Sequence, residues 1–256
     1  MSGHAWAAFY HTDLQGVWAL WAVPLACLVY LAVVRPDPGR ALDPMRTSFM
    51  WRYALVFSIE TMLDPLLGGP VVRALGLADT WVATTVMVLF VLLGDFRVFL
   101  LVFALVMPAR PLDRQGVLAA AAEAARWTLL VPLVTLAVHR TLDALLGPLP
   151  AQSIWLVYEL AFLTLAVVLR ARLLPAWLGH GQEALHAYLR AVLAYVALYY
   201  ALWAGADILI LGGVDAGWLV RIVPNQLYYA LWVPTAYLLF FSPRYAAMSS
   251  STQTSR

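Results

Sequence analysis

The sequence predicts an all-α, polytopic integral membrane protein with seven transmembrane helices, the N-terminus outside and the C-terminus in the cytoplasm. Of its 256 residues, 63% are hydrophobic and 12% charged, with a mean hydropathy of +0.80. Soluble domains carry about 25% charged residues. We expect one transmembrane domain over residues 1–241 and a short cytoplasmic tail, 242–256, whose Ser- and Thr-rich sequence is typical of disorder.

Seven apolar runs are long enough to cross a bilayer, which takes about 20 helical residues. In chain order they are Leu14–Val34, Met50–Leu67, Thr80–Met107, Val117–Val138, Gln152–Leu173, Ala187–Gly212 and Gly217–Phe241. Pro and Gly gather in nearly every gap, as helix ends require. No basic residue precedes Arg35, so the first run lacks the n-region of a cleaved signal peptide and is interpreted as a spanning helix.

The Arg residues predict the orientation, because cytoplasmic loops are enriched in basic residues. One side of the predicted bundle collects Arg35, Arg40, Arg46, Arg52, Arg110, Arg114, Arg170, Arg172, Arg190, Arg244 and Arg256. The other side has Arg73, Arg140 and Arg221. This asymmetry favours a cell (plasma) membrane, such as a bacterial inner membrane, with the Arg-rich side in the cytoplasm.

Composition also bears on cofactors and partners. The Arg residues are scattered and the formal net charge is only +2, which argues against nucleic acid. All basic residues are Arg, and without Lys a retinal Schiff base is excluded, although microbial rhodopsins also have seven helices. The five His residues have no helical metal-pair spacing, so haem and zinc are not expected. An all-carboxylate metal site stays open.

Ionisable side chains within the apolar runs are the strongest functional signal, since they are costly in lipid. Glu60 and Asp64 are four residues apart and share one helix face. Asp95 and Arg97 point about 200° apart on their helix, so they must find partners on different neighbours. Glu123 and Arg126, three residues apart, are expected to form a structural pair.

The candidate ligand- or ion-binding residues share one predicted depth, between the membrane centre and its outer face. They are Glu60, Asp64, Asp95, Glu159, Asp207, Arg221, Asn225 and Gln226. Five carboxylates outnumber the bases there, so some should be protonated or hold a cation. The first helix carries no carboxylate and is expected to be peripheral. Deep aromatic residues such as Tyr200 and Trp203 are expected to pack between helices.

Three functions fit this pattern. The first is a binding or transport protein with an outward-facing acidic cavity for a cation, a proton or a small amphipathic ligand. The second is an intramembrane enzyme that modifies or hydrolyses a lipid, with Asp95 and Asp207 as catalytic acid and base. The third is an assembly subunit that binds a membrane protein partner through the Ala-rich face of Leu118–Ala125.

The enzyme hypothesis has one resemblance behind it. Gly94-Asp95 and Ala206-Asp207 resemble the paired-aspartate pattern of the lysoplasmalogenase-like membrane hydrolases, over a few residues around each Asp. That resemblance implies lipid hydrolysis by the two aspartates. The predicted helix number is seven where the family would have eight, so the pattern does not establish membership.

Overall fold

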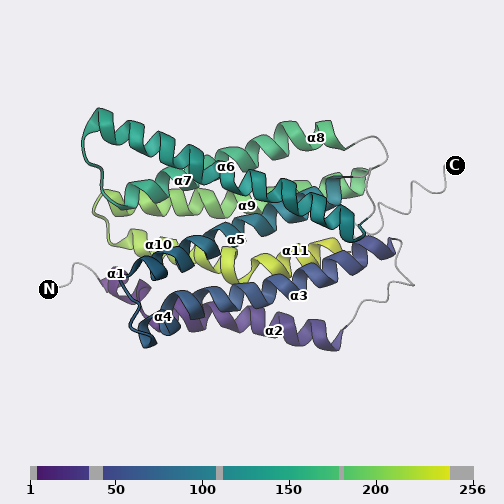
Figure 1. Cartoon of the computed structure of the whole chain (residues 1–256), viewed down its shortest axis with the longest axis horizontal. Coiled ribbons are helices and arrows are strands. Elements are labelled where there is room, and N and C mark those ends of the chain that lie inside the picture. Colours follow the sequence, from purple (N-terminus) through teal and green to yellow (C-terminus); the bar gives the residue numbers. More distant parts are fainter. Residues whose placement is uncertain (1–4, 35–42, 108–111, 179–181, 243–256) are drawn as a thin grey trace.

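The computed structural model describes residues 5–34, 43–107, 112–178 and 182–242, and the regular structure in these ranges is helical (Figure 1). The α-helices are α1 (Ala5–Tyr10), α2 (Ala19–Val33), α3 (Pro44–Leu66), α4 (Val72–Ala74), α5 (Trp81–Val106), α6 (Arg114–Leu146), α7 (Gln152–Val168), α8 (Leu174–Trp177), α9 (Glu183–Leu211), α10 (Ala216–Asn225) and α11 (Trp232–Phe240). Four π-helical turns join some of them: η1 (Leu14–Trp18), η3 (Leu67–Val71), η4 (Leu169–Leu173) and η5 (Gln226–Ala230). The predicted tail lies outside the described residues, except for Ser242.

Six continuous helical stretches in the described ranges are long and apolar enough to cross a membrane. They are Leu14–Val33, Pro44–Ala74, Trp81–Val106, Arg114–Leu146, Gln152–Trp177 and Glu183–Leu211. These stretches contain most of the first six predicted runs. The chain therefore has the structure of a multi-span helical membrane protein, while a seventh crossing and the orientation remain predictions.

The seventh predicted run, Gly217–Phe241, is not one continuous helix. It is divided into α10, η5 and α11, with an interruption at Leu231, whose N–H donates to the Gln226 carbonyl five residues back at 2.9 Å. The carbonyls of Leu227 and Tyr228 accept hydrogen bonds from the side chains of Tyr195 (2.8 Å) and Arg97 (2.6 Å). Irregular backbone at this depth is thus satisfied by protein, as an apolar surrounding requires.

The second run is longer than predicted. The Gly-Gly-Pro sequence after Leu67 was expected to end the helix, but the chain continues through η3 to Ala74. A π-helical turn accommodates the missing N–H of Pro70 without ending the helix. At the other end, the Asp43 side chain accepts from the Arg46 N–H at 2.9 Å and begins α3 earlier than hydropathy indicated.

The two groups of Arg residues lie at opposite ends of the bundle among the described positions. Figure 1 places α1, α4 and α10 at one end, and the first turns of α3 and α6 at the other. Arg73 and Arg140 lie towards the first end, and Arg46 and Arg114 lie at the second. This distribution agrees with the predicted asymmetry of the loops.

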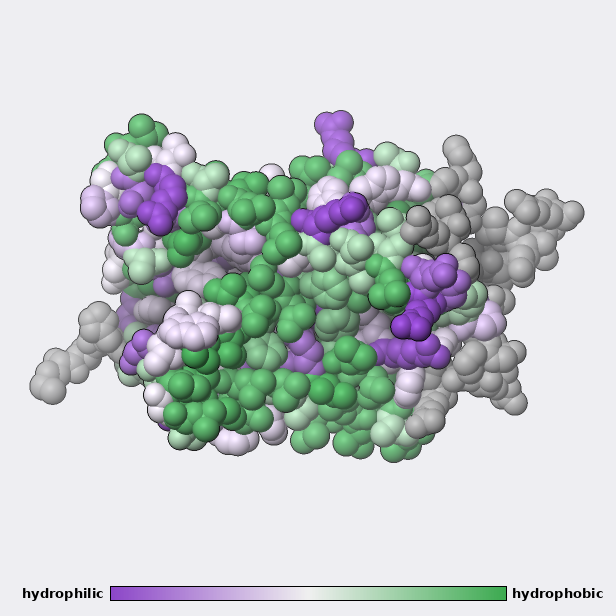
Figure 2. All heavy atoms as spheres, viewed as in Figure 1, coloured by the Kyte–Doolittle hydropathy of each residue, from purple (hydrophilic) through white to green (hydrophobic). Residues whose placement is uncertain are grey.

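The C-terminal half of α5 is the centre of the bundle, because every residue of 97–106 is buried. Among the six spanning stretches Arg114–Leu146 is the least buried, with 11% of its apolar segment buried against 50% in Trp81–Val106. The corresponding fraction for Leu14–Val33 is 28%, equal to those for Pro44–Ala74 and Gln152–Trp177, so the first helix is no more peripheral than these two. Carboxylate content does not determine packing. Figure 2 shows that hydrophobic side chains cover much of one side of the bundle.

Candidate functional site

A tight hairpin between α9 and α10 brings two of the predicted site residues together. Gly213 turns the chain with a φ of +77°, a conformation that glycine adopts without strain. A Cβ on Gly217 would lie 2.9 Å from the Ala206 carbonyl oxygen and 2.8 Å from the Ile210 side chain. The absence of a side chain at this position therefore lets α10 approach α9 closely and sets Arg221 beside Asp207.

Arg221 is the centre of a buried charge cluster. Its Nη1 forms an ion pair with Asp207 Oδ1 and lies 3.3 Å from Glu159 Oε1. Gln152 Nε2 donates to the second oxygen of Asp207 at 2.9 Å. Asp207 is 0% and Glu159 3% exposed, so two buried carboxylates share one guanidinium.

Asp95 lies in a separate polar pocket formed by tyrosines. The hydroxyls of Tyr158 on α7 and Tyr200 on α9 donate to its two carboxylate oxygens. Asp95 is fully buried. Two hydroxyl donors partly replace the hydration that a buried carboxylate loses.

Arg97 points to other elements, as its spacing from Asp95 predicts. Its Nη1 lies 3.3 Å from Glu60 Oε2 and donates to Thr61 Oγ1 at 2.7 Å. Its guanidinium carbon also lies 4.5 Å from the ring centre of Tyr228, a cation–π geometry. Glu60 on α3 is therefore neutralised by Arg97, and the expectation that Arg97 reaches a carboxylate on an adjacent helix is confirmed.

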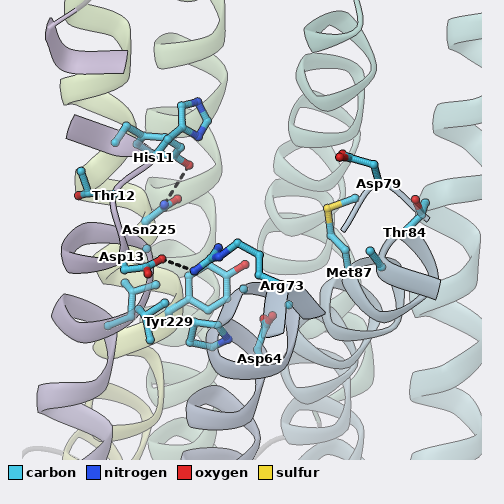
Figure 3. Close-up of a pocket in the computed structure, with 18 of the residues that line it drawn as sticks. His11, Thr12, Asp13, Asp64, Arg73, Asp79, Thr84, Met87, Asn225 and Tyr229 are labelled. Atoms are coloured by element: carbon cyan, nitrogen blue, oxygen red, sulfur yellow. Dashed lines mark hydrogen bonds and ion pairs between the residues drawn. The ribbon is translucent and has the colours of Figure 1, made fainter. Parts of the chain in front are cut away.

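A cavity of about 460 Å³ lies at the bundle end that carries α1 and α4, and we call it the vestibule (Figure 3). Asp13 and Arg73 form an ion pair at its edge, 2.5 Å apart, and their side chains are 53% and 52% exposed, so this edge of the cavity is open at the protein surface. Asp64 and Asp79 also line the vestibule. Within the described part of the chain, Asp64 has no hydrogen-bond or ion-pair partner.

A second cavity of about 230 Å³ lies next to the vestibule, and we call it the aromatic chamber. Its polar lining residues include Glu159, Arg221 and Asn225. Its aromatic lining residues are Tyr10, Trp155, Tyr158, Tyr200, Trp203, Tyr228 and Tyr229. Tyr200 and Trp203 are buried and their ring centroids lie 5.5 Å apart, so the prediction that the deep aromatic residues pack between helices is confirmed for these two, which also line this chamber.

The vestibule and the aromatic chamber share four lining residues, Tyr10, Met87, Asn225 and Tyr229. Asn225 is held in place, because its Nδ2 donates to the Tyr10 hydroxyl at 3.0 Å and its Oδ1 accepts from Trp203 Nε1 at 2.8 Å. The two cavities are thus adjacent.

The five predicted carboxylates do not converge on one centre. Glu159 and Asp207 meet at Arg221, Glu60 pairs with Arg97, and Asp95 lies among tyrosines. Two more residues belong to the predicted set: Asp64 lines the vestibule, and Gln226 lines neither cavity. The structure thus replaces the single site expected at one depth with separate centres: Glu159 and Asp207 share Arg221, whereas Glu60 and Asp95 have other partners.

Several residues of the site carry no pattern that reveals them in the sequence. Tyr10 precedes the first apolar run, and Gln152 begins the fifth. Both nevertheless contact the charge cluster: the Tyr10 hydroxyl accepts from Arg221 Nε at 3.3 Å, and Gln152 donates to Asp207.

The structural pair predicted on the fourth helix is confirmed, with Arg126 Nη1 3.0 Å from Glu123 Oε2. No group of three His, Cys, Asp or Glu suited to a metal ion occurs in the described ranges, so the all-carboxylate site has no candidate ligands there.

The fold and the two cavities define a helical membrane protein with a polar recess at one end. In comparisons with protein-family models, curated proteins and solved structures, the chain matches none of them. The paired-aspartate resemblance to lysoplasmalogenase-like hydrolases gains no support from these comparisons.

Proposed function

We propose that this chain is a membrane protein that binds or transports a small ligand, which enters through the vestibule and reaches the aromatic chamber. The observation that carries the proposal is the adjacency of the two cavities, which share Tyr10, Met87, Asn225 and Tyr229. Concave sites with apolar walls and a few convergent polar groups are typical of ligand-binding sites. The candidate ligands are a cation, a proton or a small amphipathic molecule.

In the proposed orientation the vestibule faces the outside of a plasma membrane, such as a bacterial inner membrane, and the bundle crosses the bilayer seven times. The sparse Arg content of that end supports this orientation. The broken stretch from α10 to α11 would be the seventh crossing. Discontinuous helices are common where transporters bind their substrates.

The other two hypotheses have weaker support. Neither Asp95 nor Asp207 lines the vestibule or the aromatic chamber, and each is occupied by its own hydrogen-bond donors. An acid and base pair needs contact with a substrate. For the assembly subunit, Ala120 and Ala124 of the Ala-rich segment are buried within the chain, so these two residues do not contribute to a surface for a partner.

Thiol labelling tests the recess and its orientation. Starting from Cys27→Ser, which removes the one natural cysteine, Ala83→Cys places a thiol in the vestibule, and Ala104→Cys places one in the core of the same helix. A membrane-impermeant maleimide added outside intact cells should label the first variant and not the second. Met45→Cys, at the opposite end, should react only after the cells are opened. Labelling of Met45→Cys in intact cells would overturn the orientation.

Native mass spectrometry tests ligand binding itself. The gently solubilised protein should retain a small-molecule mass that Ala83→Trp, which fills the vestibule, reduces. Thr85→Trp is the matched control, since Thr85 is exposed on the same helix and lines neither cavity. Equal retention in both variants, or no bound mass in the unmodified protein, would contradict the proposal.

A further inference from the structure

We propose that the aromatic chamber is a binding site for a small organic cation, either a quaternary ammonium or a protonated amine. This inference rests on the proposed binding function and names its ligand class. Three properties of the chamber lead to it: an unbalanced carboxylate, a lining rich in aromatic side chains and a small volume.

The unbalanced carboxylate is Glu159. In the charge cluster, two buried carboxylates face one guanidinium, because Arg221 pairs with both Asp207 and Glu159. Glu159 lines the chamber and is 3% exposed, and its Oε2 has no hydrogen-bond partner among the described residues. A buried carboxylate oxygen without a donor is costly. One bound cation would balance the charge, and an N–H donor on it would also satisfy this oxygen.

The aromatic wall supplies the second kind of contact. The ring centroid of Trp203 lies 5.0 Å from that of Tyr228 and 5.5 Å from that of Tyr200, and all three residues line the chamber. The guanidinium of Arg97 already lies over the Tyr228 ring, so Trp203 and Tyr200 are the rings left for a ligand. Trp155 also lines it. Cations over Trp and Tyr faces are attracted by the ring quadrupole, and this attraction is strongest when the cation has lost its water. Alkylated ammonium groups lose water more readily than metal ions and suit such a wall.

The volume limits the size of the ligand. Sites for drug-sized molecules have volumes of about 300–1,000 Å³, and the chamber has about 230 Å³. The ligand is therefore smaller than a drug-sized molecule.

The vestibule next to the chamber favours cations over anions, since three carboxylates and one guanidinium line it: Asp13, Asp64, Asp79 and Arg73. An excess of carboxylates raises the local concentration of cations and repels anions.

Two probes of the same shape, choline and its uncharged isostere 3,3-dimethylbutanol, show how much of the binding depends on the positive charge of the ligand. Binding to the purified full chain is measured by tryptophan fluorescence, with sodium chloride at equal ionic strength as the salt control. We expect saturable binding of choline and at least about tenfold weaker binding of the alcohol, as loss of cation–π and ionic contacts predicts. Equal affinity for both probes, or no saturable choline binding, would overturn the inference.

Glu159→Gln tests the proposed counter-ion, with Glu123→Gln, whose carboxylate lines neither cavity, as the matched control. Loss of one charge-assisted contact should weaken choline binding by about 10-fold to 100-fold in the first variant, and the second should bind as the unmodified chain does. Unchanged affinity in Glu159→Gln would refute the assignment. If that variant does not fold, Trp155→Leu replaces it, and choline binding should be weaker than in the unmodified chain because an aromatic lining residue is lost. Trp18→Leu is its control, since Trp18 is 53% exposed, and equal choline affinity in both variants would refute the assignment.

Two further outcomes have defined meanings. Tighter binding of a short-chain phosphatidylcholine than of free choline would support the ammonium chemistry and assign its source to a lipid headgroup. If choline does not bind while the vestibule thiol reacts and a bound mass is retained, the ligand class is wrong and the proposed function stands.

Discussion

The sharpest stability prediction concerns Arg221. Arg221→Met removes the cation from between Asp207, which is 0% exposed, and Glu159, which is 3% exposed. Removing one partner of a buried ion pair is expected to destabilise a protein by about 3–5 kcal/mol, because an uncompensated charge stays buried. Asp207 keeps the hydrogen bond from Gln152 at 2.9 Å, so we do not expect a larger effect.

The assay is unfolding in mixed detergent micelles with increasing dodecyl sulfate, followed by tryptophan fluorescence. Arg140→Met is the control, since Arg140 is exposed near the same end of the bundle and a surface substitution changes stability by about 0.5 kcal/mol or less. Adding Asp207→Asn to Arg221→Met should recover part of the loss, with a coupling of about 0.5–3 kcal/mol. A loss of at most about 1 kcal/mol in Arg221→Met, as an exposed pair would give, would refute the reasoning.

Three smaller predictions use the same unfolding assay. Gly217→Ala should destabilise by about 1–3 kcal/mol through overpacking, whereas Gly205→Ala, which meets no atom within 4 Å, should stabilise by about 0.4–1 kcal/mol; the opposite order would contradict the hairpin geometry. Tyr158→Phe should lose about 1–3 kcal/mol, because Asp95 loses a donor while buried, and an unchanged midpoint would show that water replaces the hydroxyl. Glu123→Gln should change stability by about 1 kcal/mol or less, since the guanidinium of its ion-pair partner Arg126 is 77% exposed, and a larger loss would show that solvent does not weaken this pair.

The sequence alone was sufficient to predict a helical protein that crosses a membrane several times. Hydropathy over about 20 residues predicts seven spanning runs, and six of them correspond to long, continuous helical stretches in the described ranges, because each such helix satisfies its own backbone and must be apolar along its length. The helical spacing rule also separates Asp95 from Arg97, since residues two apart on a helix cannot face the same neighbour. These properties depend on neighbours in the chain, so they are visible before folding.

Tertiary structure alone decided which charges meet. Arg221 lies beside Asp207 because Gly213 and Gly217 close the hairpin of α9 and α10, and Glu159 joins them from α7. Helix rotation and neighbour identity arise from packing between distant segments, which hydropathy does not encode. The cavities have the same origin: Tyr10 precedes the first apolar run, yet it lines both the vestibule and the aromatic chamber, because folding places α1 against α10.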